Sequence, residues 1–139
     1  MATYANGASR YVRGYDNGPV SSTVKSMRFD LDNGAGTTVD DVVMRPDVAV
    51  TVTAVRAVYT DATTGTVAGA NFKVGTTVGG AEIVAATAYE NTKAVGTKTD
   101  ATIVAGAVAA GVPIIVRHTG IAATAAGMAY IEIEYRHNV

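Results

Sequence analysis

Cysteine and tryptophan are both absent from this chain of 139 residues, and Leu31 is its only leucine. Without cysteine, the chain can form neither a disulfide framework nor a thiolate metal site. The shortage of leucine argues against helices, because soluble helices rely on Leu, Glu, Lys and Gln. The net charge of -1 gives no electrostatic preference for nucleic acid. We therefore expect no nucleic-acid partner.

Two kinds of apolar segment are also missing. The first ten residues, Met1 to Arg10, lack the apolar core of a signal peptide. Charged residues interrupt every apolar run before it reaches the length of a membrane span. We expect a protein that is made in the cytoplasm and has no membrane partner.

The residues that are abundant favour strands. Hydrophobic residues make up 48% of the chain but aromatic residues only 6%, so the apolar content is mostly Val, Ala and Ile. Threonine is frequent as well, and there are 15 glycines. Val, Ile and Thr fit pleated, half-buried surfaces. The composition predicts an all-β domain with a thin core, to which oligomerisation could add burial.

Alternating apolar residues and turn signals predict seven or eight short strands, which is typical of a sandwich or barrel. We expect a single antiparallel β-sandwich, jelly-roll-like, over residues 20–139, with an extended N-terminal arm over residues 1–19. Residues 85–94 fit a short helix or a continued strand equally well, and residues 106–111 read as a loop of small residues. The strands are expected at 24–32, 39–44, 48–59, 99–105, 112–118 and 128–136, with two shorter β-prone runs inside 71–84.

Two strands carry clear face assignments. In the last strand, Ala129, Ile131, Ile133 and Tyr135 alternate with polar residues and should face the core. In the segment 48–59, strict alternation places Val48, Val50, Val52 and Ala54 on one face, and Ala49, Thr51, Thr53, Val55, Ala57 and Tyr59 on the other. Arg56 interrupts this pattern, which indicates a position near solvent.

A glycine-rich turn lies between the two β-prone runs of residues 71–84. Its segment from Gly75 to Gly80 has the glycines of a phosphate-binding loop, but Ala81 stands where such a loop carries lysine. We interpret it as a turn in which glycine permits positive φ, with Phe72 and Val74 supplying core contacts. Ile83 and Val84 are expected in the core for the same reason.

Candidate chemical groups do not form a recognisable active site. Asp30, Asp32 and Asp41 have a spacing related to a calcium loop, but Gly34 and Ala35 occupy positions where a ligand and the glycine are required. His118 and His137 have no evident third zinc ligand. Glu132 and Glu134 could serve as paired carboxylates in glycoside hydrolysis, but they read better as a solvated charged face. We expect no catalytic, cofactor-binding or metal-ligating residue, no cofactor and no enzymatic activity.

The N-terminal arm is the predicted interface. Tyrosine and arginine are enriched where a segment docks on a partner, and the arm carries five of them, namely Tyr4, Arg10, Tyr11, Arg13 and Tyr15. A solvated, disordered tail is the alternative interpretation, because chain termini are commonly unordered.

Three segments of the second half, residues 72–84, 110–116 and 127–135, resemble the small β-sandwich virion proteins of tailed bacteriophages. These are capsid decoration, or cement, proteins and related head or tail accessory proteins. The resemblance covers roughly residues 48–136 and includes no catalytic signature. It implies a homotrimer on the capsid surface of a virion that binds the major capsid protein through terminal arms. A head-fibre or tail-tip module that binds a receptor or carbohydrate is the alternative function.

Overall fold

The computed structural model describes residues 23–30, 38–60, 70–90, 92–119 and 129–139. Within these ranges the chain forms strands and no helix, and no helix there could cross a membrane. The predicted arm, residues 1–19, lies outside the described residues. The strands are β1 (Lys25–Asp30), β2 (Thr38–Met44), β3 (Val50–Tyr59), β4 (Asn71–Gly75), β5 (Val84–Ala88), β6 (Lys98–Asp100), β7 (Ala107–Val108), β8 (Ile114–Thr119) and β9 (Ala129–His137).

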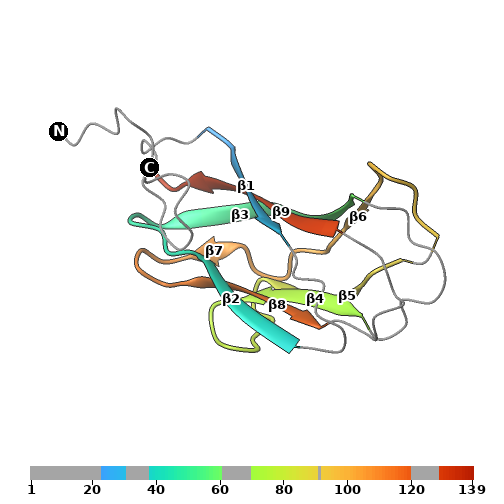
Figure 1. Cartoon of the computed structure of the whole chain (residues 1–139). Coiled ribbons are helices and arrows are strands. Elements are labelled where there is room, and N and C mark those ends of the chain that lie inside the picture. The colour runs from blue at the N-terminus through green and yellow to red at the C-terminus, as the bar shows by residue number, and fades with distance from the viewer. Residues whose placement is uncertain (1–22, 31–37, 61–69, 91, 120–128) are drawn as a thin grey trace.

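The strands form two antiparallel sheets, which Figure 1 shows as separate layers. The first sheet has the order β1-β9-β3-β6, and β7 pairs with β3 beside β6. The second sheet has the order β2-β8-β4-β5. Apolar side chains from both sheets form one core cluster between the layers. The predicted all-β sandwich is confirmed.

The pairings are nested along the sequence. β1 pairs with β9, β2 with β8, β3 with β6 and β7, and β4 with β5. Two further ladders, β3 with β9 and β8 with β4, join these pairs into the sheets. The chain therefore behaves as one long antiparallel ribbon, folded so that its successive strand pairs alternate between the layers.

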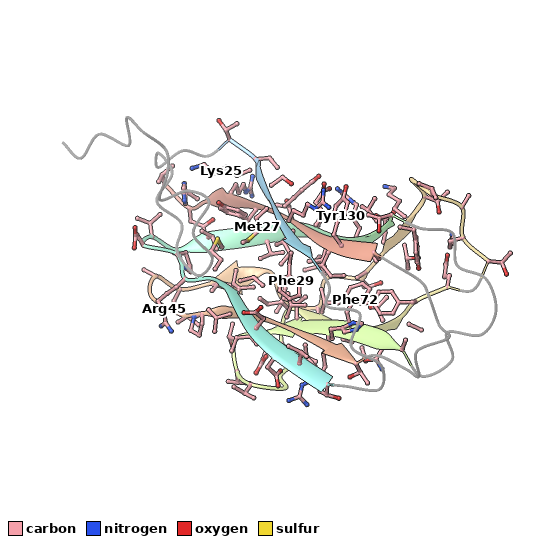
Figure 2. The ribbon with its side chains drawn as sticks, viewed as in Figure 1. Lys25, Met27, Phe29, Arg45, Phe72 and Tyr130 are labelled. Carbon is pink, nitrogen blue, oxygen red and sulfur yellow. The ribbon has the colours of Figure 1, made fainter. Side chains whose placement is uncertain are left out.

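The core lies between β3 and β9 of the first sheet and β4 and β8 of the second. Phe29 and Phe72, from opposite sheets, are both buried in this layer (Figure 2). The residues predicted to face inward on the last strand, Ala129, Ile131, Ile133 and Tyr135, are all buried. Those predicted around the glycine turn, Phe72, Val74, Ile83 and Val84, are at most 1% exposed. The period-2 pattern of apolar residues thus identified the inner face of the last strand and of Phe72 and Val74, whereas Ile83 and Val84 are adjacent and both buried.

The face assignment predicted for segment 48–59 is wrong in part. Its register against β9 shifts between Val52 and Ala54, which marks a β-bulge. Val50 and Val52 are buried before the bulge, whereas Val55, Ala57 and Tyr59 are buried after it. Because a bulge inserts one residue, the alternation changes phase at Thr53. Both halves of β3 consequently face the same core.

Three other expectations change at the level of elements. Residues 84–88 form strand β5, so the start of the ambiguous segment is a strand rather than a helix. The predicted strand 99–105 is shorter, because only Lys98–Asp100 forms β6 and a single bridge joins Ile103 to Val84. The predicted loop 106–111 contains the two-residue strand β7, which pairs with the start of β3.

Candidate functional site

The residues predicted to form the interface lie outside the described part of the chain: Tyr4, Arg10, Tyr11, Arg13 and Tyr15. The same holds for Asp32 of the calcium hypothesis. Asp30 and Asp41 lie on strands β1 and β2, which belong to different sheets. His118 and His137 are likewise on different sheets, in β8 and β9. Across the described ranges, no three His, Cys, Asp or Glu side chains gather as metal ligands would.

A row of alternating charges crosses the outer face of the first sheet. Cross-strand pairing aligns Arg28 of β1 with Glu132 of β9, Glu132 with Arg56 of β3, and Arg56 with Asp100 of β6. The signs run positive, negative, positive, negative, so each directly opposed pair is attractive. We call these four residues the charged row.

Arg56 is the centre of the charged row. Its Nη1 donates to Glu134 Oε1 at 2.8 Å and to Glu132, and its Nε donates to Asp100 Oδ1 at 3.2 Å. These hydrogen bonds, first of all the one to Glu134, raise the pKa of Arg56 above its ordinary value. Only 18% of the Arg56 side chain is exposed, so the guanidinium is partly withdrawn from water among its three acceptors. Glu132 and Glu134 are held by one cation, and the arrangement cross-links β3, β6 and β9.

A buried polar cluster lies at the β5–β6 connection. The Tyr59 hydroxyl contacts Thr99 Oγ1 at 2.9 Å and accepts the backbone N–H of Glu90 at 2.9 Å. The Tyr89 hydroxyl lies 3.0 Å from His118 Nδ1, and the Tyr89 ring packs against Phe72. Burial raises the pKa of Tyr59 and raises that of Tyr89 well above its ordinary value. Both hydroxyls therefore stay protonated at neutral pH; that of Tyr59 ties loop backbone to the sandwich, and that of Tyr89 contacts the His118 side chain on β8.

The glycine-rich turn is built around a carboxylate of its own chain. Residues 76–82, which we call the strap, join β4 to β5 on the outer side of the second sheet (Figure 1). The Glu82 carboxylate accepts the Thr76 N–H at 3.0 Å and the Thr77 hydroxyl at 2.7 Å. These bonds lower the pKa of Glu82, the Thr77 hydroxyl contributing most. The Thr76 N–H is one of the backbone donors that a phosphate-binding loop would use. In this turn it donates to Glu82 instead.

A second carboxylate fastens the strap to the sheet. Asp40 of β2 accepts the Gly79 N–H at 3.1 Å and the Arg117 Nε–H at 2.8 Å, and its other oxygen pairs with Arg117 Nη2. Arg117 comes from β8, where it is the cross-strand neighbour of Asp40. This bidentate ion pair lowers the pKa of Asp40 and raises that of Arg117. Gly79 has φ of +70°, the left-handed conformation that glycine tolerates best.

Part of this arrangement was visible in the sequence. The interpretation of residues 75–80 as a glycine turn agrees with the structure, since Gly79 has positive φ and the Gly80 N–H donates to the Thr77 carbonyl at 2.9 Å. The roles of Glu82, Asp40 and Arg117 were missed. Asp40 and Arg117 are 77 positions apart, and only the β2–β8 register brings them together. The sequence showed only that each is a charged residue within a predicted strand, Asp40 in 39–44 and Arg117 in 112–118.

The described side chains thus form three satisfied polar groups: the charged row, the tyrosine cluster and the strap with its anchor. Each joins elements that are distant in sequence, and each uses its ionisable groups to fix a strand or loop in place. A comparison of the chain with models of known protein families found no match, and comparisons with curated proteins and with solved structures found no significant match.

Proposed function

We propose that this chain is a structural virion protein that decorates and stabilises the capsid of a tailed bacteriophage. In this proposal it is a homotrimer on the capsid surface, and it binds the major capsid protein. Its N-terminal arm, residues 1–19, contacts the capsid or a neighbouring subunit. The chain has no enzymatic activity of its own and needs no cofactor. It is made in the host cytoplasm and functions in the virion.

The nested strand pairing is the observation that carries this proposal. Strand pairs that wrap alternately into two layers support a jelly-roll topology, and jelly rolls build many viral capsid and lectin domains. The strand order therefore supports both a virion protein and a carbohydrate-binding module. Because a fold by itself does not define a function, the side chains must distinguish the two.

The positions of the tyrosines favour the structural role over carbohydrate binding. Many sugar-binding sites use exposed aromatic rings on which a ligand can stack. Of the four tyrosines in the described ranges, Tyr59 and Tyr135 are buried, and the Tyr89 hydroxyl is turned toward His118. Tyr130 lies on the outer face, but the guanidinium of Arg28 covers its ring at 3.9 Å from the centroid. These rings stabilise the sandwich or are already stacked.

The ionisable groups favour a structural role in the same way. A catalytic carboxylate must be able to exchange a proton with a substrate near neutral pH. Asp40 and Glu82 instead have lowered pKa values because they accept hydrogen bonds from the chain itself. Glu132 and Glu134 both accept hydrogen bonds from Arg56. Such groups suit a rigid protein that presents surfaces to partners.

The proposal is tested by the mass of the protein in solution and by its binding to capsids. We expect light scattering to give three times the mass of the chain. We also expect the full chain to co-sediment with purified tailed-phage capsids that lack decoration proteins, and a variant lacking residues 1–19 to remain in the supernatant.

Two results would count against this function. A stable monomer that binds no capsid but binds immobilised glycans would favour the head-fibre or tail-tip alternative. Capsid binding that is undiminished by removal of residues 1–19 would contradict the role of the arm while leaving the decoration function intact.

A further inference from the structure

The strap covers part of the outer face of the second sheet. The backbone carbon of Gly80 lies 2.6 Å from where a Cβ on Gly75 would stand, so the strap folds directly back over the end of β4. Ile115 is the cross-strand neighbour of Gly75 and alternates onto the same face as Arg117. Although it is on this outer face, Ile115 is only 5% exposed. We attribute this burial to the strap that lies above it.

Two carboxylates hold the strap: Glu82 fixes a turn within it, and Asp40 fastens it to the sheet. Glu82 holds its first turn through Thr76 and Thr77, and Asp40 holds its apex through the N–H of Gly79. Three charged groups face these contacts from the strands beneath: Asp40 on β2, Arg117 on β8 and Lys73 on β4. Lys73 is the cross-strand neighbour of Arg117. Of these three charged groups, Asp40 is the anion and the other two are cations.

We propose that the strap is an acid-released device: protonation of Asp40 and Glu82 detaches residues 76–82 from the outer face of the second sheet while the sandwich stays folded. Release would expose Ile115 beside Val42, which is already 36% exposed, and would free the exposed Val78 at the strap's apex. A small apolar patch would then form on a face that is otherwise polar. This inference depends on the strap contacts alone and is independent of the proposed function.

The direction of the pH effect follows from the two carboxylates. Hydrogen bonds from Arg117 and from Thr77, respectively, hold the pKa values of Asp40 and Glu82 below their ordinary values of 3.8 and 4.5. A carboxyl group with a lowered pKa stabilises the folded form fully above its unfolded-state pKa. That stabilisation is lost as the pH falls through the lowered value. The strap is therefore closed at neutral pH and opens below about pH 4.

The sandwich beneath is held by different interactions. The ladders of β8 with β2 and with β4 consist of backbone hydrogen bonds, and the core between the sheets is apolar. Neither depends on ionised carboxylates. The charged row lies on the other sheet, where backbone ladders join β1, β9, β3 and β6 whether or not its carboxylates are ionised. Local opening of the strap should precede global unfolding, as is common for loops fastened by few contacts.

Hydrogen–deuterium exchange of the full chain tests the proposal. Protection of the amides in residues 76–82, corrected for the intrinsic effect of pH, should fall at least roughly tenfold between about pH 7 and about pH 3. Amides of β8 and β9 should remain protected at both values. The double variant Asp40→Asn with Glu82→Gln should show the same loss at neutral pH, because its amides imitate the uncharged carboxyl groups.

A matched control comes from the other outer face. The double variant Glu132→Gln with Glu134→Gln removes the same number of carboxylates from the first sheet and should leave exchange of the strap unchanged. Strap protection in the Asp40/Glu82 variant equal to that of the natural chain would overturn the proposal. Loss of strap and β8 protection together in that variant at neutral pH would overturn it as well, because the strap would then not open separately.

Discussion

Gly79 combines a backbone conformation and a neighbour that both exclude a side chain. Its φ is +70°, and a Cβ at this position would lie 2.9 Å from Cζ of Arg117. The guanidinium cannot move away without breaking its ion pair with Asp40. We predict that Gly79→Val lowers the free energy of unfolding by about 1–3 kcal/mol, measured by chemical denaturation.

Gly96 provides a control for this prediction. It also has positive φ, +81°, but no atom lies within 4 Å of its added Cβ. Gly96→Val should therefore show the conformational cost without the loss of the anchor. Equal destabilisation by the two substitutions would mean that the Arg117 contact has no energetic importance.

Tyr59 makes the stability depend on pH in the alkaline range. Burial raises its pKa, so its neutral form is favoured in the folded protein. The resulting stabilisation is complete below the unfolded-state pKa of about 10 and is lost as the pH rises through the folded-state value. Tyr59→Phe should cost about 1–2 kcal/mol at neutral pH, because Thr99 and the Glu90 N–H lose a partner. The substitution should also make the free energy of unfolding fall less steeply above about pH 10, because the residue that titrates there has been removed. Tyr130→Phe, on the outer face, should leave the free energy of unfolding at neutral pH nearly unchanged.

At the scale of elements, Arg56 makes β3 the link between β6 and β9. Arg56→Met retains the apolar stem but removes the cation that Glu132 and Glu134 share. We expect a loss of about 1–3 kcal/mol in the free energy of unfolding, measured by urea denaturation. Arg136→Met, an exposed position on β9, should stay within about 0.5 kcal/mol of the natural chain.

A double variant identifies the cause of the Arg56 effect. Adding Glu134→Gln to Arg56→Met should recover part of the lost stability, because it removes one of the two like charges. No recovery would indicate that Arg56 stabilises β3 through its packing alone.

Strand composition explains which elements could be predicted from the sequence. In β9 an apolar residue occupies every second position from Ala129 to Tyr135, so its inner face followed from period 2, while its end at His137 lies one residue beyond the predicted one. In β3 both faces are apolar or threonine except at Arg56, and this single interruption did not reveal the bulge at Thr53. β6 and β7 are too short for any periodicity to appear. The candidate site shows the same limit: the turn glycines were evident locally, whereas Asp40 and Arg117 became partners only through sheet register.

At the scale of the whole molecule, both sheets of the described sandwich contribute to one apolar core. The core cluster begins at Phe29, with Met27 packed against it. We predict that a variant lacking residues 1–19 unfolds cooperatively at nearly the same temperature as the full chain, measured by calorimetry or circular dichroism. A large fall in the melting temperature would show that the arm is part of the folding unit rather than a separate contact element.

The nested strand pairing has a consequence for how the chain acquires its structure during synthesis. The partner of Lys25 is Tyr135, and β9 separates β1 from β3 in the first sheet. While the chain leaves the ribosome, β1 and β3 therefore each have an unpaired edge, the one that later pairs with β9, until β9 has emerged. Closing such distant pairs is slow, and folding times of milliseconds to seconds are typical of sandwiches with many long-range contacts. A ribosome that stalls before β9 would release a chain with two open strand edges, and such a chain would be prone to aggregation.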